Sequence, residues 1–221
     1  MNSHGPQNWR KMMEEIVCGF DRDGRTGSRA PSLLLHSCCA PCSSSVITTL
    51  ADFFRITVFY YNPNIDEKDE YEKRAREQER LVALLPTPLP VRFLEGEYRS
   101  ADFLVTAGRF ADEPEGGARC TFCYGLRLEK TARTAAEGGF DYFCSTLSVS
   151  PLKDAVRINS IGQSLAEMHG IAWLPSDFKK KDGYKKSVEL SRTYDLYRQD
   201  YCGCSFSRRV REMDGTRIHR G

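Results

Sequence analysis

The sequence predicts an α/β fold: a mostly parallel, Rossmann-like sheet with flanking helices. Two observations lead to this prediction. Short runs of aliphatic, β-branched and aromatic residues alternate along the chain with amphipathic stretches of ten or more residues, which is the pattern of βαβ crossovers. Turns rich in cysteine or asparagine follow the first two runs. Binding sites form at the carboxyl ends of parallel strands, so we expect a cysteine-rich metal site at that edge.

The first half of the chain predicts an amino-terminal helix and two strand–helix units. Residues 9–18 carry apolar side chains at helical spacing and predict the first helix. The apolar run at residues 32–36 predicts a buried strand, and residues 43–54 predict the helix after it. Residues 56–61 are β-branched and aromatic, which predicts a second strand. The charged amphipathic stretch at residues 67–85 predicts a helix that a cluster of prolines ends.

The second half continues the alternation. Residues 91–94 predict a third strand, and residues 101–107 predict a short helix before a polar loop. Residues 121–137 predict a long helix that the following glycine pair ends. The remaining expected elements are strands over residues 141–148 and 171–174 and helices over residues 153–168 and 185–194.

The composition is that of an ordinary globular protein with balanced charge. Hydrophobic residues make up 40% and charged residues 28% of the chain, and the formal net charge is +2. No apolar run approaches the roughly 20 residues of a membrane-spanning helix, and the first 18 residues lack the apolar stretch of a signal peptide. We therefore expect a cytoplasmic protein without a membrane partner. Its expected parts are an extension (residues 1–30), an α/β domain (31–205) and a basic tail (206–221).

Nine cysteines are the unusual feature of this composition. In a reducing cytoplasm, clustered cysteines usually bind metal or carry out redox chemistry. Cys18 and Cys144 stand alone, and we interpret them as thiols without a site. The other seven fall in three clusters: Cys38, Cys39 and Cys42; Cys120 and Cys123; and Cys202 and Cys204.

The first two clusters predict metal binding. Cys120 and Cys123 are spaced so that two thiolates converge on one metal, and a position at the start of a helix lowers the pKa of a thiol. The cysteines at residues 38–42 add three candidate ligands, and the resulting total of five exceeds the four thiolates that an iron–sulfur cluster requires. Zinc is the competing metal, but adjacent cysteines and surplus thiols favour redox-active iron.

The Cys202-Gly203-Cys204 segment predicts a different chemistry. Two thiols separated by one residue can close only a small, strained ring, and strained disulfides are the labile, catalytic kind. The pair is therefore a candidate redox-active dithiol. Alternatively, both thiolates bind a second metal.

Two further features have alternative interpretations. His36 is either a proton donor near the metal or a hydrogen-bonded structural histidine, which is the commoner case. A lysine-rich segment with interleaved tyrosines suits an RNA backbone and a splayed base, or it is simply a solvated face. Its lysines are Lys179, Lys180, Lys181, Lys185 and Lys186.

Six segments together resemble the QueH family of epoxyqueuosine reductases. They cover most of the chain between residues 32 and 205. They are HSCCAPCSS (36–44), YYNPNI (60–65), RCTFCYGLRLEKTA (119–132), STLSVSPLKD (145–154), FKKKDGYKKSVELSR (178–192) and LYRQDYCGC (196–204).

The resemblance implies a cobalamin-independent enzyme that reduces epoxyqueuosine to queuosine at the wobble position of tRNA, the last step of queuosine synthesis. It implies a [4Fe-4S] cluster and an α/β catalytic domain. By position, the implied cluster ligands are Cys38, Cys39, Cys120 and Cys123. Cys202 and Cys204 are the implied redox-active pair or ligands of an additional iron, and Cys42 is a candidate ligand of that second metal.

The implied reaction removes an epoxide oxygen and consumes two electrons and two protons. His36, Tyr124 and water are candidate proton donors, and the five lysines are candidate tRNA contacts. The implied partners are tRNA carrying epoxyqueuosine and an unidentified electron donor. Two other functions suit the cysteines: another iron–sulfur tRNA-modifying enzyme, or a structural zinc RNA-binding module. A tRNA-thiolating enzyme would require an ATP-binding loop, which the sequence lacks.

Overall fold

The five predicted strands form one parallel sheet in the computed structural model, which describes residues 7–214. Every pair of neighbouring strands is parallel, so the predicted fold class is confirmed. Residues 1–6 and 215–221, which include Arg217 and Arg220 of the predicted basic tail, lie outside the described residues. The spatial order is β3-β2-β1-β4-β5, and the strands are β1 (Ser32–Ser37), β2 (Arg55–Tyr60), β3 (Arg92–Glu95), β4 (Tyr142–Ser145) and β5 (Ala172–Trp173).

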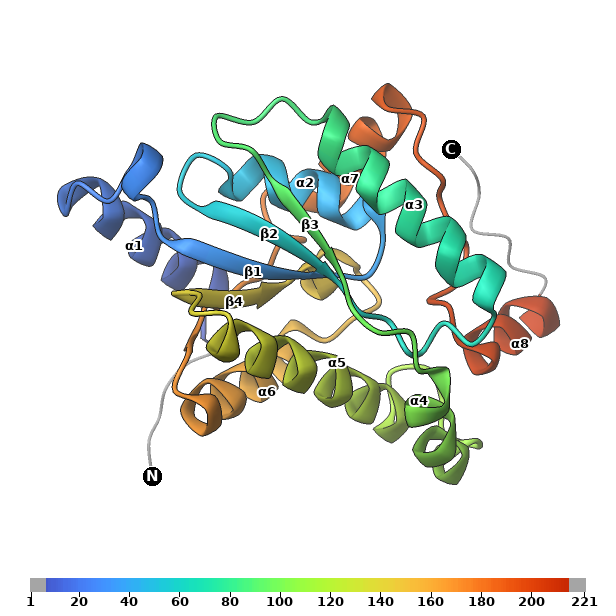
Figure 1. Ribbon diagram of the computed structural model, residues 1–221. Helices are drawn as coiled ribbons and strands as arrows, with labels where there is room; N and C mark the ends of the chain where they lie inside the picture. Colours follow the sequence, from blue (N-terminus) through green and yellow to red (C-terminus); the bar gives the residue numbers. More distant parts are fainter. Residues whose placement is uncertain (1–6, 215–221) are drawn as a thin grey trace.

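Helices cover both faces of this sheet (Figure 1). α2 (Ala40–Leu50), α3 (Lys68–Leu84) and α7 (Gly183–Thr193) lie on one face, and α5 (Ala118–Glu137) and α6 (Ala155–His169) lie on the other. α4 (Ser100–Ala107) and α8 (Ser205–Asp214) lie towards the carboxyl ends of the strands. At the amino ends, α1 (Trp9–Arg22) packs Phe20 against Phe54 and Tyr142. Because both faces are covered, the central strands are apolar almost throughout.

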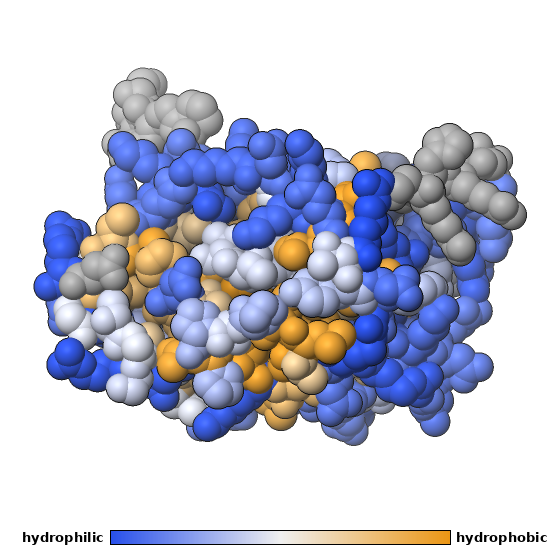
Figure 2. All heavy atoms as spheres, turned by 90° about the horizontal axis from the view of Figure 1, so that it is seen from above, coloured by the Kyte–Doolittle hydropathy of each residue, from blue (hydrophilic) through white to orange (hydrophobic). Residues whose placement is uncertain are grey.

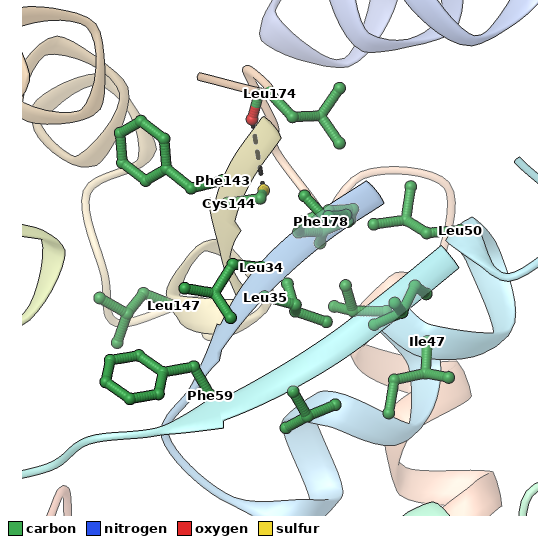
Figure 3. Packing of buried hydrophobic residues seen from close by; sticks show 14 of the residues in the cluster. Leu34, Leu35, Ile47, Leu50, Phe59, Phe143, Cys144, Leu147, Leu174 and Phe178 are labelled. Carbon is green, nitrogen blue, oxygen red and sulfur yellow. Dashed lines mark hydrogen bonds between the residues drawn. The ribbon is translucent and has the colours of Figure 1, made fainter. Parts of the chain in front are cut away.

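The centre of the core lies on β1. Leu33, Leu34 and Leu35 have no exposed surface. Leu34 pairs in register with Thr57 of β2 and Phe143 of β4. Figure 3 shows Leu34 and Leu35 among the side chains of the helices and strands around them. Each fully buried leucine contributes roughly 1.5–3 kcal/mol of hydrophobic free energy, so β1 is a rigid support for the turn that follows it.

The chain leaves the two central strands in opposite directions. β1 leads through α2 to β2 on one side, whereas β4 leads through α6 to β5 on the other. Such a topological switch point opens a crevice at the carboxyl ends of the two strands. The first cysteine cluster follows β1, and a 3₁₀ turn, Thr146–Val149, follows β4. The fold therefore directs both segments towards the same crevice.

Three elements near the crevice differ from the sequence-based expectation. α2 begins at Ala40 rather than residue 43, because a proline fits the first turn of a helix, where its missing N–H is not needed. The strand expected over residues 141–148 ends at Ser145, whose hydroxyl oxygen accepts a hydrogen bond from the N–H of Leu147 and starts the 3₁₀ turn. Residues 206–214, expected as part of a basic tail, belong to α8 (Ser205–Asp214).

The surface is largely hydrophilic, with apolar side chains in small groups. Figure 2 shows a face whose margin is hydrophilic and whose middle carries apolar residues. The larger exposed apolar side chains come from separate helices, such as Leu84 on α3, Val105 on α4 and Met168 on α6, which is normal for a globular protein. Within residues 7–214, no helix is long and apolar enough to cross a membrane.

Candidate metal centre

The first cysteine cluster occupies the turn between β1 and α2. Cys39 is the N-cap of α2, and Cys42 lies in its first helical turn. The backbone N–H of Cys38 donates a 3.3 Å hydrogen bond to the Thr146 hydroxyl, which ties this turn to the one after β4. The Sγ atoms of Cys38, Cys39 and Cys42 all lie within 4.8 Å of one another. Such close thiols can hold a metal ion together.

Hydrogen bonding between these thiols separates their pKa values. The thiols of Cys39 and Cys42 stabilise a Cys38 thiolate and hold its pKa well below the ordinary value, against the opposing effect of burial. The same contact with Cys38 raises the pKa of Cys39 to about 11 and also raises that of Cys42. The turn therefore favours one thiolate with two thiol neighbours before any metal binds.

The second cluster lies at the start of α5. Gly117 is the N-cap, so Cys120 lies in the first turn and Cys123 one turn further along the same helix face. The N–H of Gly116 approaches the Cys120 sulfur at 3.2 Å. The expectation that the helix field lowers the pKa of both thiols is wrong for Cys123. Burial raises its pKa to about 11, against the opposing charge of Arg127.

The third cluster lies in the turn before α8. Gly203 has a φ of +116°, and a Cβ there would lie 2.6 Å from Cγ1 of Ile65, so this turn requires glycine. The Sγ atoms of Cys202 and Cys204 are 3.5 Å apart, and all nine cysteines are free thiols. A hydrogen bond from the Cys204 thiol lowers the pKa of Cys202 well below the ordinary value, whereas that of Cys204 is raised. One thiolate beside one thiol is the usual state of a reduced redox-active pair.

Polar contacts to α3 and its preceding loop hold this turn in place. The side chain of Arg74, 2% exposed, donates to the carbonyl oxygens of Tyr201 and Cys202 and pairs with Glu70. The Asn64 amide also donates to the Cys202 carbonyl oxygen, at 3.2 Å. The Cys202 turn is thus docked on the asparagine-rich loop after β2 and on the helix that follows it.

The three clusters line one cavity of about 150 Å³. Cys123 and Cys204 also pack in one apolar cluster with Phe103. The first and third clusters both line this cavity. The fold therefore brings together cysteines, such as Cys38 and Cys204, that are more than 160 residues apart in the sequence. The lining cysteines are Cys38, Cys39, Cys42, Cys120, Cys123, Cys202 and Cys204.

Arg127 and Lys153 are among the cations that line the same cavity, and neither has a carboxylate within 4.0 Å among residues 7–214. Arg127 is 3% exposed and donates to the carbonyl oxygen of Cys123 and to Oδ1 of Asn62. Burial lowers the pKa of Lys153, but the nearby Cys38 and Cys42 sulfurs more than offset this, so its net pKa is raised. These cations favour thiolates in the cavity.

His36 and Tyr124 occupy different environments. His36 is fully buried and does not line the cavity. Its Nε2–H donates to the carbonyl oxygen of Tyr61, and its Nδ1 accepts from the Ser145 hydroxyl. Burial, assisted by the charge of Arg127, lowers its pKa to about 3, so the ring is neutral. Tyr124 does line the cavity, and burial raises the pKa of its phenol to about 12.

The five candidate lysines do not form a single uniform patch. The Lys179 ammonium pairs with Asp177 at 3.0 Å, and Lys181 pairs with Glu14 of α1. Lys180, Lys185 and Lys186 are exposed and have no ion-pair partner within the described part of the chain. Tyr184, between them in the sequence, lines the cavity.

The two isolated cysteines lie away from the cavity, as expected. Cys18 is exposed on α1. Cys144 is fully buried on β4, and its thiol donates to the Leu174 carbonyl oxygen at 3.3 Å (Figure 3).

Sequence reasoning did not single out Lys153, Arg127 or Arg74. A signal existed for two of them. Arg127 is four residues after Cys123 and therefore shares its helix face, and Lys153 follows a strand at the edge where sites form. Arg74 offered no such signal, because its partners in the carboxyl-terminal turn are 127 and 128 residues away.

Comparison with known proteins points to one family. A family model described as "Epoxyqueuosine reductase QueH" matches residues 33–210. A relative of that name from Staphylococcus epidermidis is 40% identical over 217 residues, which cover 96% of this chain and 90% of the relative. A relative of the same name from Streptococcus pyogenes serotype M1 is 40% identical, and the match covers 97% of this chain and 83% of that protein. Another from Thermotoga maritima is 35% identical, and the match covers 80% of this chain and 90% of that protein.

Proposed function

Because this chain belongs to the QueH family of epoxyqueuosine reductases, we propose that it reduces epoxyqueuosine to queuosine at the wobble position of tRNA with a [4Fe-4S] cluster. The family makes the chain an oxidoreductase of queuosine biosynthesis. The observation that carries the finer proposal is the single cavity lined by seven cysteines from three distant segments. Since the substrate is tRNA, we expect the enzyme to act in the cytoplasm.

The residues of the cavity fit an iron–sulfur cluster. All seven thiols are free, and the charges of Arg127 and Lys153 would offset those of bound thiolates. The residues that would hold the cluster are Cys38, Cys39, Cys120 and Cys123. When bound, the cluster would supply the electrons for the reduction.

Cys202 and Cys204 suit either of two roles beside the cluster. As a dithiol, the pair would hold two electrons and release them when it is oxidised to a disulfide. As ligands, the two sulfurs would bind an additional iron, for which Cys42 is a further candidate because it lies near Cys38 and Cys39. The 3.5 Å separation of the Cys202 and Cys204 sulfurs supports both proposals. An external electron donor would regenerate the reduced enzyme.

The proposed reaction converts an epoxide, two electrons and two protons into an alkene and water. Tyr124 is the better placed of the two candidate proton donors, because it lines the cavity as a neutral phenol. Both ring nitrogens of His36 are already hydrogen-bonded inside the protein. Of the five candidate lysines, we propose that Lys180, Lys185 and Lys186 contact the tRNA backbone, because they are exposed and have no ion-pair partner among residues 7–214.

Metal analysis and an activity assay test this proposal. After anaerobic purification we expect a brown protein that contains iron and sulfide, absorbs near roughly 400 nm and reduces epoxyqueuosine in tRNA with dithionite as electron source. Cys39→Ala and Cys120→Ala should lose iron and activity, whereas the control Cys18→Ala, which changes an exposed thiol far from the cavity, should retain both. A colourless zinc protein, or full epoxide reduction by iron-free enzyme, would contradict the proposal.

A further inference from the structure

Lys153 is the one lysine that lines the cysteine cavity within the described residues. It ends a tight turn in which its backbone N–H donates to the Ser150 carbonyl oxygen at 3.2 Å. The residue after it, Asp154, caps α6 by accepting hydrogen bonds from two backbone N–H groups. The position of Lys153 is therefore fixed by backbone structure after β4, across the crevice from the cysteine turn after β1.

The ammonium of Lys153 has no fixed partner. Within residues 7–214 it takes part in no hydrogen bond and has no carboxylate within 4.0 Å. Lys179 provides a contrast, since its ammonium binds both Asp177 and the carbonyl oxygen of Lys153. An ammonium offers three N–H donors, and those of half-buried Lys153 are available to a ligand in the cavity. A ligand oxygen in the cavity would satisfy them.

The charge of Lys153 acts on every cysteine cluster. It lowers the pKa of Cys38 in the first cluster, of Cys123 in the second and of Cys202 in the third, as a smaller contribution beside the hydrogen bonds or burial that act first on those thiols. No single cluster therefore accounts for its orientation. Lys153 lines the cavity that the three clusters share, where a substrate would have to bind to be reduced.

We propose that the Lys153 ammonium donates a hydrogen bond to the epoxide oxygen of the substrate and stabilises the negative charge that develops there as the carbon–oxygen bonds break. This inference rests on the proposed function. The electrons come from the reductant of that reaction and the oxygen leaves as water, so Lys153 contributes charge and orientation and is not consumed. A preorganised donor at a developing oxyanion is among the largest single contributions to catalysis.

Tyr124 and Arg127, which line the same cavity, suit this role less well. The phenol of Tyr124 carries no positive charge, and Arg127 is already bound to the Cys123 carbonyl oxygen and to Asn62. A phosphate-binding role is better suited to the exposed lysines at residues 180, 185 and 186 than to a half-buried one among thiols.

The test compares Lys153→Met, Lys153→Arg and the control Lys11→Met, which changes an exposed lysine on α1. Each anaerobically purified holoenzyme is assayed for iron and sulfide per chain, for midpoint potential by dithionite titration, and for single-turnover reduction over a range of epoxyqueuosine-tRNA concentrations. We expect Lys153→Met to keep its iron and to lose roughly 100- to 1,000-fold in rate at saturating tRNA. The tRNA concentration at half-saturation should stay close to the wild-type value. Loss of a positive charge beside the thiolates should make the potential more negative, which makes the cluster a stronger reductant and so does not explain a slower reduction.

Lys153→Arg separates position from charge. Because its planar guanidinium has a different reach and geometry, we expect it to keep iron and potential but to restore less than about a tenth of the lost rate. The role of Lys153 would be overturned by full activity of Lys153→Arg or by an unchanged rate in Lys153→Met. It would also be overturned if both variants lost iron, if the rate loss followed the potential, or if the effect were confined to the tRNA concentration at half-saturation. If wild-type enzyme reduces no epoxyqueuosine, the proposed function fails instead.

Discussion

The guanidinium of Arg74 and the carbonyl oxygen of Cys202 are joined by a hydrogen bond of 3.4 Å across 128 residues of sequence. Arg74 belongs to α3, and Cys202 belongs to the turn before α8. The same guanidinium pairs with Glu70, at 2.6 Å, where neither side chain is more than 12% exposed. One buried arginine therefore connects the helix after the second strand with the third cysteine cluster.

Removing this arginine should loosen the third cluster. We expect Arg74→Met to reduce the free energy of unfolding by about 3 kcal/mol, because Glu70 and two backbone carbonyls lose a buried partner. Alkylation of Cys202 and Cys204 in metal-free protein should become faster. The matched control is Arg76→Met on the same helix, where the ion pair with Glu72 is exposed and contributes less than about 1 kcal/mol. Equal urea stabilities and equal alkylation rates for the two variants would show that Arg74 does not hold the turn.

Gly203 should tolerate no side chain. Gly203→Ala would strain a φ of +116° and press a methyl group against Ile65, so we expect loss of more than about 1 kcal/mol of stability and impaired reactivity of the flanking cysteines. Gly139→Ala is the control, because Gly139 also has a positive φ but nothing lies within 4 Å of its Cβ position. Urea unfolding and thiol titration measure both effects. If Gly203→Ala is no worse than the control, the close approach to Ile65 does not matter.

The buried neutral His36 should make stability depend on pH. Its pKa is lowered to about 3 in the folded protein, compared with about 6.5 in an unfolded chain. Below about pH 6.5 the unfolded chain binds a proton that the folded chain does not, so the free energy of unfolding falls by about 1.4 kcal/mol per pH unit. Relative to His36→Gln, which cannot titrate, metal-free wild-type protein should lose about 2 kcal/mol between about pH 6.5 and about pH 5. Parallel stability curves for the two proteins would contradict a neutral folded-state histidine.

The exposed lysines of the segment before and within α7 should contribute to tRNA affinity. We expect the double variant Lys185→Gln/Lys186→Gln to bind tRNA several-fold more weakly. The slope of the logarithm of the binding constant against the logarithm of the salt concentration should become shallower by about one for each lost phosphate contact. Iron content and stability should not change, because both side chains are exposed. Lys11→Gln on α1 serves as the control for the loss of one exposed positive charge elsewhere on the surface. If the salt dependence of binding is the same in the double variant and the wild-type protein, these lysines are solvated surface residues that do not contact tRNA.

Much of the fold was predictable because local signals coincided with tertiary structure. The run at residues 32–36 and the β-branched run at residues 56–61 are buried on both faces, so their apolar character predicted strands. The carboxyl end of β4 was less predictable because it depends on the serine that caps the following 3₁₀ turn. The start of α2 was less predictable because it depends on a proline in the first helical turn. α8 was missed because arginines dominate its sequence and its contacts, such as that of Arg208 with Glu67, are distant in the chain.

The sequence alone determined which residues are the candidates for the chemistry. Three cysteine clusters, their spacing and their order are enough to indicate a metal-dependent redox protein and its family. Only the tertiary structure decided how they meet: parallel strands bring the first cluster to a switch point, and the Arg74 contacts dock the third cluster against α3. The neutral state of His36 and the lack of a partner for Lys153 among residues 7–214 also depend on the fold, because burial and charge at a residue are set by neighbours that local sequence does not specify.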